Sequence, residues 1–192
     1  MKKLPNDSRQ HILDVARVLM SSKGYTAVGL AEIVAAAGVP KGSFYYYFKS
    51  KEEFGQALLE EYFAAYLPKV DARLVGPGTG RERLMAYFQF WADTQGVDLP
   101  VDKCLVVKLG PEVCDLSEGM RVVLQRGTEA IVSRIAQCIE QGQADGSITT
   151  SVSAPALAAA LYQLWLGASL LAKVGQAAPF DTARTATEHL LA

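Results

Sequence analysis

Apolar residues recur every three to four positions along most of the chain, which is the spacing of one face of an α-helix. The pattern predicts helices over residues 8–23, 30–37, 41–48, 51–74, 81–94, 118–144, 154–176 and 182–191. Runs that alternate between apolar and polar residues are too short to predict a sheet. We therefore expect an all-α protein.

Two segments interrupt the helical pattern. Residues 75–80 are rich in glycine and contain Pro77, which predicts a loop. Between residues 95 and 118 the periodicity is broken by Gly96, Pro100, Gly110 and Pro111. We expect this second stretch to be irregular, and it holds two of the three cysteines.

The segment 154–172 contains no charged residue over nineteen positions, which is long enough to raise the possibility of a membrane-spanning helix. Pro155, Tyr162, Gln163 and Ser169 within it, and the lack of a basic flank on its N-terminal side, argue against that interpretation. We expect instead a helix that is buried on one side by its own domain and on the other by a partner subunit.

The helices predicted at 30–37 and 41–48 are joined by Gly38-Val39-Pro40, which is the layout of a helix-turn-helix. Glycine tolerates a positive φ in the turn, and proline pre-sets the first turn of the next helix. The sequence therefore predicts an N-terminal three-helix DNA-binding domain over residues 1–50. Residues 51–192 are expected to form a second, helical domain.

The second helix of this motif has the side chains expected for contact with DNA. Tyrosine hydroxyls donate to phosphate oxygens, tyrosine rings pack on sugars and thymine methyls, and a lysine near the helix start reaches base edges. Gly42 allows a close approach of the backbone, whereas Phe44 and Phe48 are expected to face inward. The expected DNA-binding residues are Lys41, Gly42, Ser43, Tyr45, Tyr46, Tyr47, Lys49 and Lys51.

The formal net charge of −1 hides a division of charge along the chain. Residues 1–52 carry eight Lys or Arg against four Asp or Glu, whereas the remaining residues carry eleven against sixteen. A basic N-terminal segment fits a polyanionic partner. The odd cysteine count favours free thiols over a disulfide framework, and the absence of a signal-peptide pattern predicts a cytoplasmic protein.

The residues expected of an enzyme or a metal site are missing. His11 and His189 are the only histidines, so neither a histidine metal site nor a nucleophile with a histidine base is easily assembled. Glycine-rich phosphate-binding fingerprints are also absent. We expect no catalytic residues, no metal and no cofactor.

The N-terminal segments GY at 24–25, LAEI at 30–33 and AGVPKGSFYYYFKSK at 37–51 closely resemble the DNA-binding domain of the TetR family. The resemblance implies a transcriptional repressor that binds a pseudo-palindromic double-stranded operator as a homodimer, with the last two long helices at the dimer interface and Lys51 on a phosphate. Pro40 stands where the family usually has Ser or Thr, and Gly29 where it often has a hydroxyl cap. These two positions therefore lack the hydroxyl groups typical of the family. The resemblance also implies that residues 51–192 form a sensing and dimerisation domain.

Cys104 lies between Lys103 and Lys108 at what would be the start of a helix. Two ammonium groups and a helix N-terminus stabilise a thiolate, which is the form that attacks electrophiles and is oxidised to a sulfenic acid. The alternative is that Cys104 is a small buried hydrophobic residue. The residues alone leave both interpretations open.

A second resemblance covers most of the chain and includes CLVVKL at 104–109, EVCDLSE at 112–118 and LYQLWLGA at 161–168. It points to the TetR subgroup of repressors that respond to N-ethylmaleimide and other electrophiles, in which a cysteine matching Cys104 is the sensor. Cys114 is flanked by acidic residues and is interpreted as secondary or structural, and Cys138 as a core residue. Lys173 either points into the pocket as an amine partner for oxidised Cys104 or marks where its helix meets water.

The resulting hypothesis is a repressor released from its operator by an electrophile or oxidant that modifies Cys104. A second hypothesis is release by a reversible, non-covalent small molecule in an aromatic pocket, although such aromatic residues more often form a core. The residues of that pocket would be Tyr87, Phe88, Trp91, Tyr162 and Trp165. A cysteine-dependent enzyme or scavenger, and a partner-binding scaffold without DNA function, are the remaining alternatives.

Overall fold

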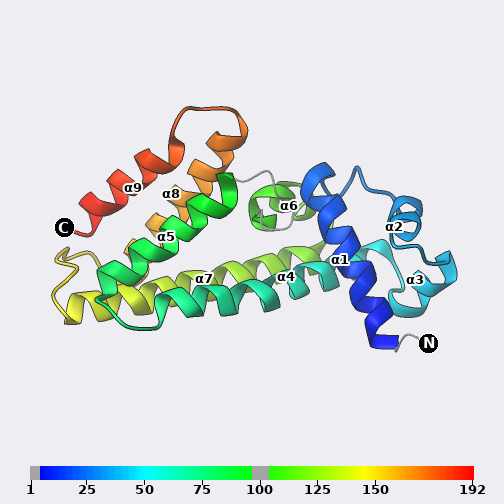
Figure 1. Cartoon of the computed structure of the whole chain (residues 1–192), viewed down its shortest axis with the longest axis horizontal. Helices are drawn as coiled ribbons and strands as arrows, with labels where there is room; N and C mark the ends of the chain where they lie inside the picture. Colours follow the sequence, from blue (N-terminus) through cyan, green and yellow to red (C-terminus); the bar gives the residue numbers. More distant parts are fainter. Residues whose placement is uncertain (1–4, 97–103) are drawn as a thin grey trace. The chain divides into compact units, whose positions relative to one another are not determined.

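A computed structural model of the chain describes residues 5–96 and 104–192, and every regular element within these ranges is an α-helix (Figure 1). The helices are α1 (Pro5–Lys23), α2 (Leu30–Ala36), α3 (Lys41–Tyr47), α4 (Lys51–Leu74), α5 (Gly80–Gly96), α6 (Leu105–Val113), α7 (Glu118–Ala144), α8 (Ala154–Lys173) and α9 (Pro179–Leu190). The predicted all-α fold is confirmed.

The chain divides into two compact units. The first comprises residues 1–64 and 99–126, and the second comprises residues 65–98 and 127–192. The boundary falls inside α4 and again inside α7, so each of these helices contributes residues to both units. The boundary expected at residue 50 separates functions, whereas these units are defined by compactness, so that boundary stays a prediction.

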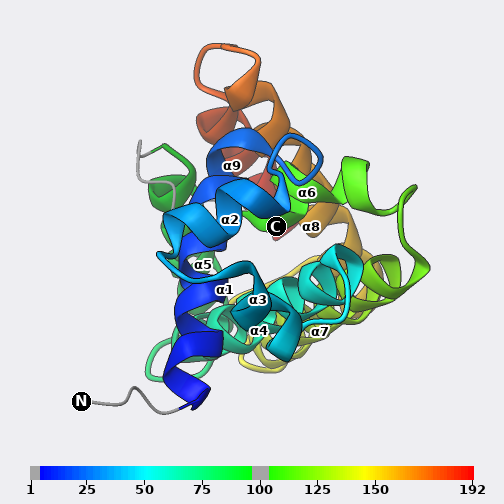
Figure 2. The same cartoon turned by 90° about the vertical axis from the view of Figure 1, so that its right-hand side faces the viewer.

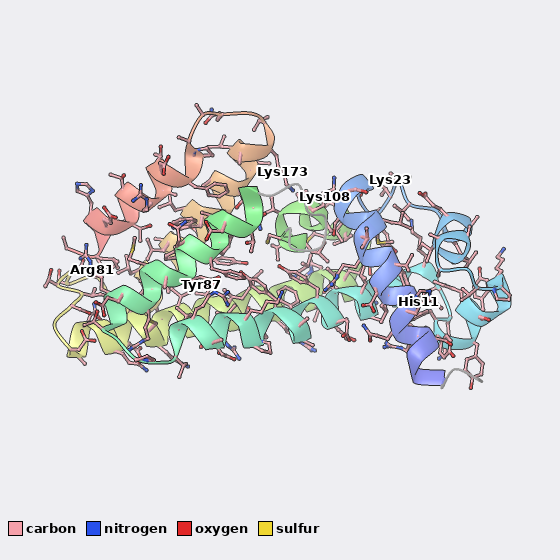
Figure 3. All side chains as sticks on the ribbon, viewed as in Figure 1. His11, Lys23, Arg81, Tyr87, Lys108 and Lys173 are labelled. Carbon is pink, nitrogen blue, oxygen red and sulfur yellow. The ribbon has the colours of Figure 1, made fainter. Side chains whose placement is uncertain are left out.

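The N-terminal helices of the first unit pack around an aromatic cluster. Phe44, Phe48 and Phe54 are almost fully buried, and their ring centroids lie 5.0 to 5.2 Å apart. The inward orientation predicted for Phe44 and Phe48 is confirmed. On the other side of α1, the His11 Nε2 donates a hydrogen bond to the carbonyl oxygen of Ala37 at 3.0 Å, which ties α1 to the end of α2 (Figure 3).

A short turn joins α2 to α3, and the two helices lie side by side in both views of the fold (Figure 2). Gly38 has a φ of +63°, in the left-handed region, and the Val39 amide donates to the Val34 carbonyl at 3.0 Å to close the turn. Pro40 then serves as the N-cap of α3 with a φ of −63°. The turn thus forms from the glycine and proline on which the helix-turn-helix prediction rested.

Helix α6 corrects the expectation of an irregular stretch between residues 95 and 118. Gly110 and Pro111 lie within this helix. Proline near the C-terminal end removes one backbone hydrogen bond, but Leu105, Leu109 and Val113 recur every four residues and are all buried. Packing of that face outweighs the two unfavourable residues; Pro100 lies outside the described residues.

The second unit is built around two buried tryptophans whose indole nitrogens are satisfied. Trp91 Nε1 donates to Ser169 Oγ at 2.8 Å, and Trp165 Nε1 donates to Thr187 Oγ1 at 3.0 Å. Trp165 also stacks on Phe88 with centroids 4.7 Å apart. Because both hydroxyl partners are buried as well, α5, α8 and α9 share one core.

Helix α8 is long and apolar enough to cross a membrane by length and composition alone, and it is the one such helix in the described part of the chain. Leu157, Leu161 and Trp165 on one face are almost fully buried, whereas Leu170 and Leu171 are exposed near its end. This division matches the expected helix with one side in its own core. The helix ends at Lys173, earlier than predicted, and Gly175 follows with a φ of +82°.

Candidate functional site

The exposed surface of α3 brings together most of the residues expected to contact DNA. Tyr46 is 76% exposed and Tyr45 is 49% exposed, while Ser43 and Tyr47 are half-buried. Lys41, Gly42 and Lys49 are exposed as well. An aromatic surface of this size in water, next to Lys41 and Lys49, is unusual for a purely solvated helix.

Local contacts hold these side chains in place. The Lys41 ammonium lies 5.9 Å from the centroid of the Tyr45 ring, within the range of a cation–π interaction. Tyr46 and Tyr47 meet edge to face with centroids 4.9 Å apart. Helix α3 therefore presents hydroxyl and ammonium donors from a surface whose inner side is fixed by Phe44.

Lys51 makes its contacts with Tyr25, in the turn between α1 and α2, and not with the side chains of α3. Its ammonium donates to the carbonyl oxygen of Tyr25 at 2.8 Å and lies 4.4 Å from the Tyr25 ring centroid. Burial lowers the pKa of Lys51, and the nearby Glu112 carboxylate opposes that shift. The ammonium has three N–H donors, so a phosphate contact by Lys51 does not exclude its hydrogen bond to Tyr25.

Cys104 is the N-cap residue of α6, and its side chain makes no capping hydrogen bond to the helix. It is buried, with 8% of the residue exposed, and the Tyr62 hydroxyl donates to its Sγ at 3.7 Å. A helix N-terminus and a donated hydrogen bond both favour negative charge on sulfur. The same position also satisfies the alternative of a small buried residue, so the sensing role stays a prediction.

The other residues predicted for the sensor are dispersed. Lys108 is half-buried on α6, one turn beyond Cys104, and its charge lowers the pKa of Glu112 (Figure 3). Cys114 is exposed at the C-cap of α6, and Lys173 is exposed in the last turn of α8. Lys173 and Cys104 belong to different units, so their proposed partnership stays a prediction, and Lys103 lies outside the described residues.

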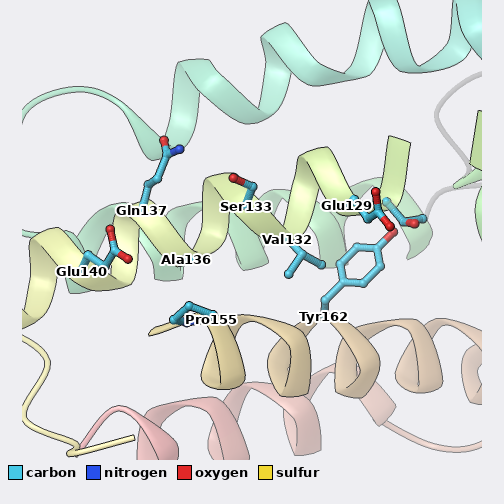
Figure 4. A pocket seen from close by; sticks show the side chains of 9 residues that line it. Glu129, Val132, Ser133, Ala136, Gln137, Glu140, Pro155 and Tyr162 are labelled. Carbon is cyan, nitrogen blue, oxygen red and sulfur yellow. The ribbon is translucent and has the colours of Figure 1, made fainter. Parts of the chain in front are cut away.

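The five aromatic residues of the predicted pocket pack against one another in the second unit. Trp91 meets Tyr87 at 6.0 Å and Tyr162 at 5.5 Å between ring centroids. A hollow of about 590 Å³ lies between α7 and α8, and Tyr162 is the only one of the five aromatics among the residues that line it (Figure 4). Apolar residues such as Val132, Ala136 and Pro155 line the hollow together with the exposed carboxylates of Glu129 and Glu140.

Metal-binding geometry is not present in residues 5–96 and 104–192, where no three His, Cys, Asp or Glu side chains gather closely enough to hold an ion. Cys138 is buried, and its Sγ donates to the Gly80 carbonyl at 3.4 Å. Burial raises the pKa of the Cys138 thiol despite the nearby Arg83. This thiol is therefore a core group, as the sequence predicted.

Two residues near the candidate site were not found by sequence reasoning. Tyr62 is 42 positions from Cys104, and no local pattern marks it as a partner of the thiol. Glu112 was considered only as an acidic neighbour of Cys114, but its carboxylate accepts hydrogen bonds from the Thr26 amide at 2.9 Å and hydroxyl at 2.7 Å. Both partnerships depend on which distant helices pack together.

Comparison with families of known proteins gives two matches along the chain. The model described as "Bacterial regulatory proteins, tetR family" matches residues 12–58. The model described as "Tetracyclin repressor-like, C-terminal domain" matches residues 80–187. Together they span both the helix-turn-helix and most of the chain that follows it.

Individual relatives agree with these matches. The chain is 38% identical over 190 residues to the HTH-type transcriptional repressor NemR of Escherichia coli strain K12, covering 98% of this chain and 94% of NemR. It is 34% identical over 167 residues to the HTH-type transcriptional repressor DhaR of Mycobacterium sp. strain GP1, covering 86% and 82%. The crystal structure of the reduced form of E. coli NemR matches with a TM-score of 0.91 at 39% identity, over 97% of each chain.

Proposed function

Because the chain belongs to the TetR family of bacterial regulatory proteins, we propose that it is released from its operator when an electrophile or oxidant modifies Cys104. At the level of the family, the chain is a helix-turn-helix transcriptional repressor and not an enzyme. Membership also implies a dimer, and a two-fold dimer reads two half-sites of a pseudo-palindromic operator. Because a bacterial repressor must reach its operator DNA, we propose a cytoplasmic location.

The surface of α3 is the proposed contact with the major groove. Lys41 at the start of the helix would reach base edges, and the backbone at Gly42 would approach the duplex closely. Tyr45, Tyr46 and the half-buried Ser43 and Tyr47 would donate hydroxyl hydrogen bonds to phosphates. Lys49 and Lys51 would neutralise phosphate charge, which makes the affinity depend steeply on salt.

One observation carries the proposed signal: the Tyr62 hydroxyl donates a hydrogen bond to the sulfur of Cys104, the N-cap residue of α6. With a quinone, the sulfur adds to a ring carbon, the π electrons move to the carbonyl oxygen, and that oxygen takes a proton from water. With a hydroperoxide, sulfur attacks one oxygen, the O–O bond breaks, and a sulfenic acid and an alkoxide or hydroxide leaving group form. The 8% exposure of Cys104 favours small reagents.

The other thiol and the two lysines have secondary roles in this proposal. Lys108 adds positive charge one helical turn from Cys104, and Lys173 is proposed as an amine partner of the oxidised sulfur. Cys114 is exposed and reacts without controlling the operator. The relative NemR, solved in a reduced form, supports redox chemistry as one source of the signal.

Modification is proposed to lower DNA affinity by displacing α6. An added ring or oxygen enlarges a buried side chain, and we expect the start of the helix to move to accommodate it. Because the DNA fixes the spacing of the half-sites, a small change in the separation of the two α3 helices of the dimer costs several contacts at once. The expected outcome is release of the whole dimer.

The experiment compares two cysteine variants by fluorescence anisotropy, on DNA from upstream of the protein's own gene at fixed salt. One equivalent of a small quinone is expected to weaken binding by the wild type and by Cys114→Ser, but not by Cys104→Ser. Cys114→Ser is the matched control because it removes the thiol at the other end of α6. Release of Cys104→Ser as readily as wild type would overturn the proposal.

A non-covalent inducer is the second candidate, and the hollow between α7 and α8 favours it. Its volume of about 590 Å³ is in the range of small-molecule sites, and Tyr162 links it to the aromatic cluster of Tyr87, Phe88, Trp91 and Trp165. Release of the operator by a ligand that leaves all thiols unmodified by mass would support this candidate.

A further inference from the structure

The turn between α1 and α2 is held by side chains from two other helices of the same unit. From α6, Glu112 Oε2 accepts hydrogen bonds from the amide of Thr26 at 2.9 Å and from its hydroxyl at 2.7 Å. From α4, the Lys51 ammonium donates to the Tyr25 carbonyl at 2.8 Å. A carboxylate and an ammonium thus bind two adjacent residues of one turn, Thr26 and Tyr25.

Gly24 makes the close approach of Glu112 possible. Its φ of +95° lies in the left-handed region, and a Cβ at this position would collide with the Glu112 carboxylate. The positive φ and the missing Cβ of Gly24 therefore leave room for this carboxylate. A glutamate that is only solvated would not require such a gap in the turn.

Glu112 is ionised at neutral pH. Burial raises its pKa, but hydrogen bonds from Thr26 and the Tyr25 amide, together with the Lys108 charge, outweigh burial and hold the pKa below its ordinary value. The Thr26 hydrogen bonds are consequently charge-assisted, which makes them stronger than those between neutral groups. Lys51 also feels this carboxylate, which partly offsets the lowering of its own pKa by burial.

Glu112 and Cys104 belong to the same short rigid element. Cys104 is the N-cap of α6, its carbonyl accepts the first hydrogen bond of the helix from Lys108 at 3.1 Å, and Glu112 lies in the last turn. At a rise of about 1.5 Å per residue the two positions are about 12 Å apart along the axis. A displacement of the start of α6 is therefore passed to the position of the carboxylate.

We propose that Glu112 is the positioning residue through which α6 fixes the α1–α2 turn in the operator-binding form. Modification of Cys104 moves α6, breaks the hydrogen bonds from Thr26 to Glu112, and frees the turn that precedes the helix-turn-helix. The release step rests on the proposed function, because it takes Cys104 as the modified residue. The role of Glu112 in the unmodified protein does not.

The test measures operator affinity of Glu112→Gln before and after quinone treatment. The amide keeps the shape of the side chain but loses the charge and turns an N–H₂ toward donors, so the reduced variant is expected to bind about tenfold more weakly, as for loss of one charge-assisted hydrogen bond. The weakening caused by quinone is expected to shrink by the same factor. The alkylation rate of Cys104 should stay near wild type, and the variant should remain folded under the conditions of the titration.

Glu118→Gln is the matched control, since Glu118 is an exposed carboxylate of the same unit whose hydrogen-bond partner is Arg121. It should leave both affinities unchanged. If Glu112→Gln does not fold, Thr26→Val removes the hydroxyl donor alone and should give a smaller loss of the same kind. Wild-type affinity and wild-type release in the folded Glu112 or Thr26 variant would overturn the inference.

The two proposals fail in different ways. A wild-type protein that quinone does not release contradicts the proposed function, and the reduced-state affinity of Glu112→Gln then decides the role of Glu112 by itself. A wild-type protein that is released, alongside a Glu112→Gln variant released by the same factor, contradicts only the inference.

Discussion

Cys104 and Cys114 lie at opposite ends of α6 in opposite environments. Cys104 is buried with the Tyr62 hydroxyl on its sulfur, whereas Cys114 is exposed. A helix places residues ten positions apart about 15 Å from each other, while a disulfide needs Cα atoms within about 7 Å. The two thiols of one chain therefore cannot be oxidised to a disulfide while α6 is folded.

Tyr62→Phe is expected to slow the modification of Cys104. The hydroxyl stabilises negative charge on the sulfur, and a hydrogen bond of this kind contributes about 1 kcal/mol, so the rate should fall about fivefold. Quinone alkylation followed by intact mass gives the rate. Tyr66→Phe on the same helix removes a hydroxyl that lies 3.5 Å from the Tyr87 hydroxyl, and it should react like wild type. Equal rates for all three proteins would contradict a role for Tyr62.

Tyr25 gives a pH dependence in the alkaline range. Burial, with a smaller contribution from Glu52, raises its pKa from 10.0 to about 12. Because the folded state resists ionisation, the stabilisation is complete below pH 10 and is lost as the pH rises through 12. The free energy of unfolding in urea should fall less steeply over this range for Tyr25→Phe, which cannot ionise. Identical pH profiles would contradict the shift.

At the residue scale, the sequence predicted the exposure of side chains whose direction depends only on their position in a helix. Lys41, Tyr45 and Tyr46 of α3 are exposed as expected, because their positions on the helix fix their direction, whereas Tyr47 is half-buried. Lys51 illustrates the limit: its ammonium is engaged by Tyr25, 26 positions earlier, and only the packing of α4 against the α1–α2 turn determines that contact.

At the element scale, the strength of the periodic pattern decided which helices were predicted. Helix α7 was predicted with its observed bounds over Glu118–Ala144, and the glycine and proline of the turn before α3 placed the helix-turn-helix. Helix α6 was missed as an element because Gly110 and Pro111 oppose helix formation locally. Burial of Leu105, Leu109 and Val113 overrides that preference, and burial depends on tertiary structure.

The contact between α5 and α7 sets a stability prediction. A Cβ at Gly80 would collide with the backbone of Gly142 and lie 2.8 Å from the Cys138 carbonyl oxygen. Since backbone atoms cannot move aside cheaply, Gly80→Ala should lower the free energy of unfolding by about 1–3 kcal/mol. Urea unfolding at fixed protein concentration measures this change.

Gly110→Ala is the control for that prediction. Nothing lies within 4 Å of the added Cβ, and alanine is the better helix former, so stability should be unchanged or rise by up to about 1 kcal/mol. A Gly80→Ala variant as stable as Gly110→Ala would contradict the close contact.

At the scale of the whole molecule, the basic N-terminal segment suits DNA binding, and the apolar helix α8 suits dimerisation. The first 52 residues carry the net positive charge, and α8 leaves Leu170 and Leu171 exposed on a chain that dimerises. The sequence predicted both features, because the charge of a segment and its apolar content can be read without knowledge of the fold. It did not predict the hollow between α7 and α8, which needs two helices brought together in three dimensions.

The central claim, that modification of Cys104 controls operator binding, is tested most directly by following both quantities in one titration. Quinone is added stepwise to the reduced wild-type protein, peptide mass spectrometry gives the fraction of each cysteine modified, and anisotropy gives the operator affinity at each step. We predict that affinity falls in proportion to modification of Cys104 and is independent of Cys114. Full modification of Cys104 with unchanged affinity, or loss of affinity while Cys104 is still free, would contradict the account.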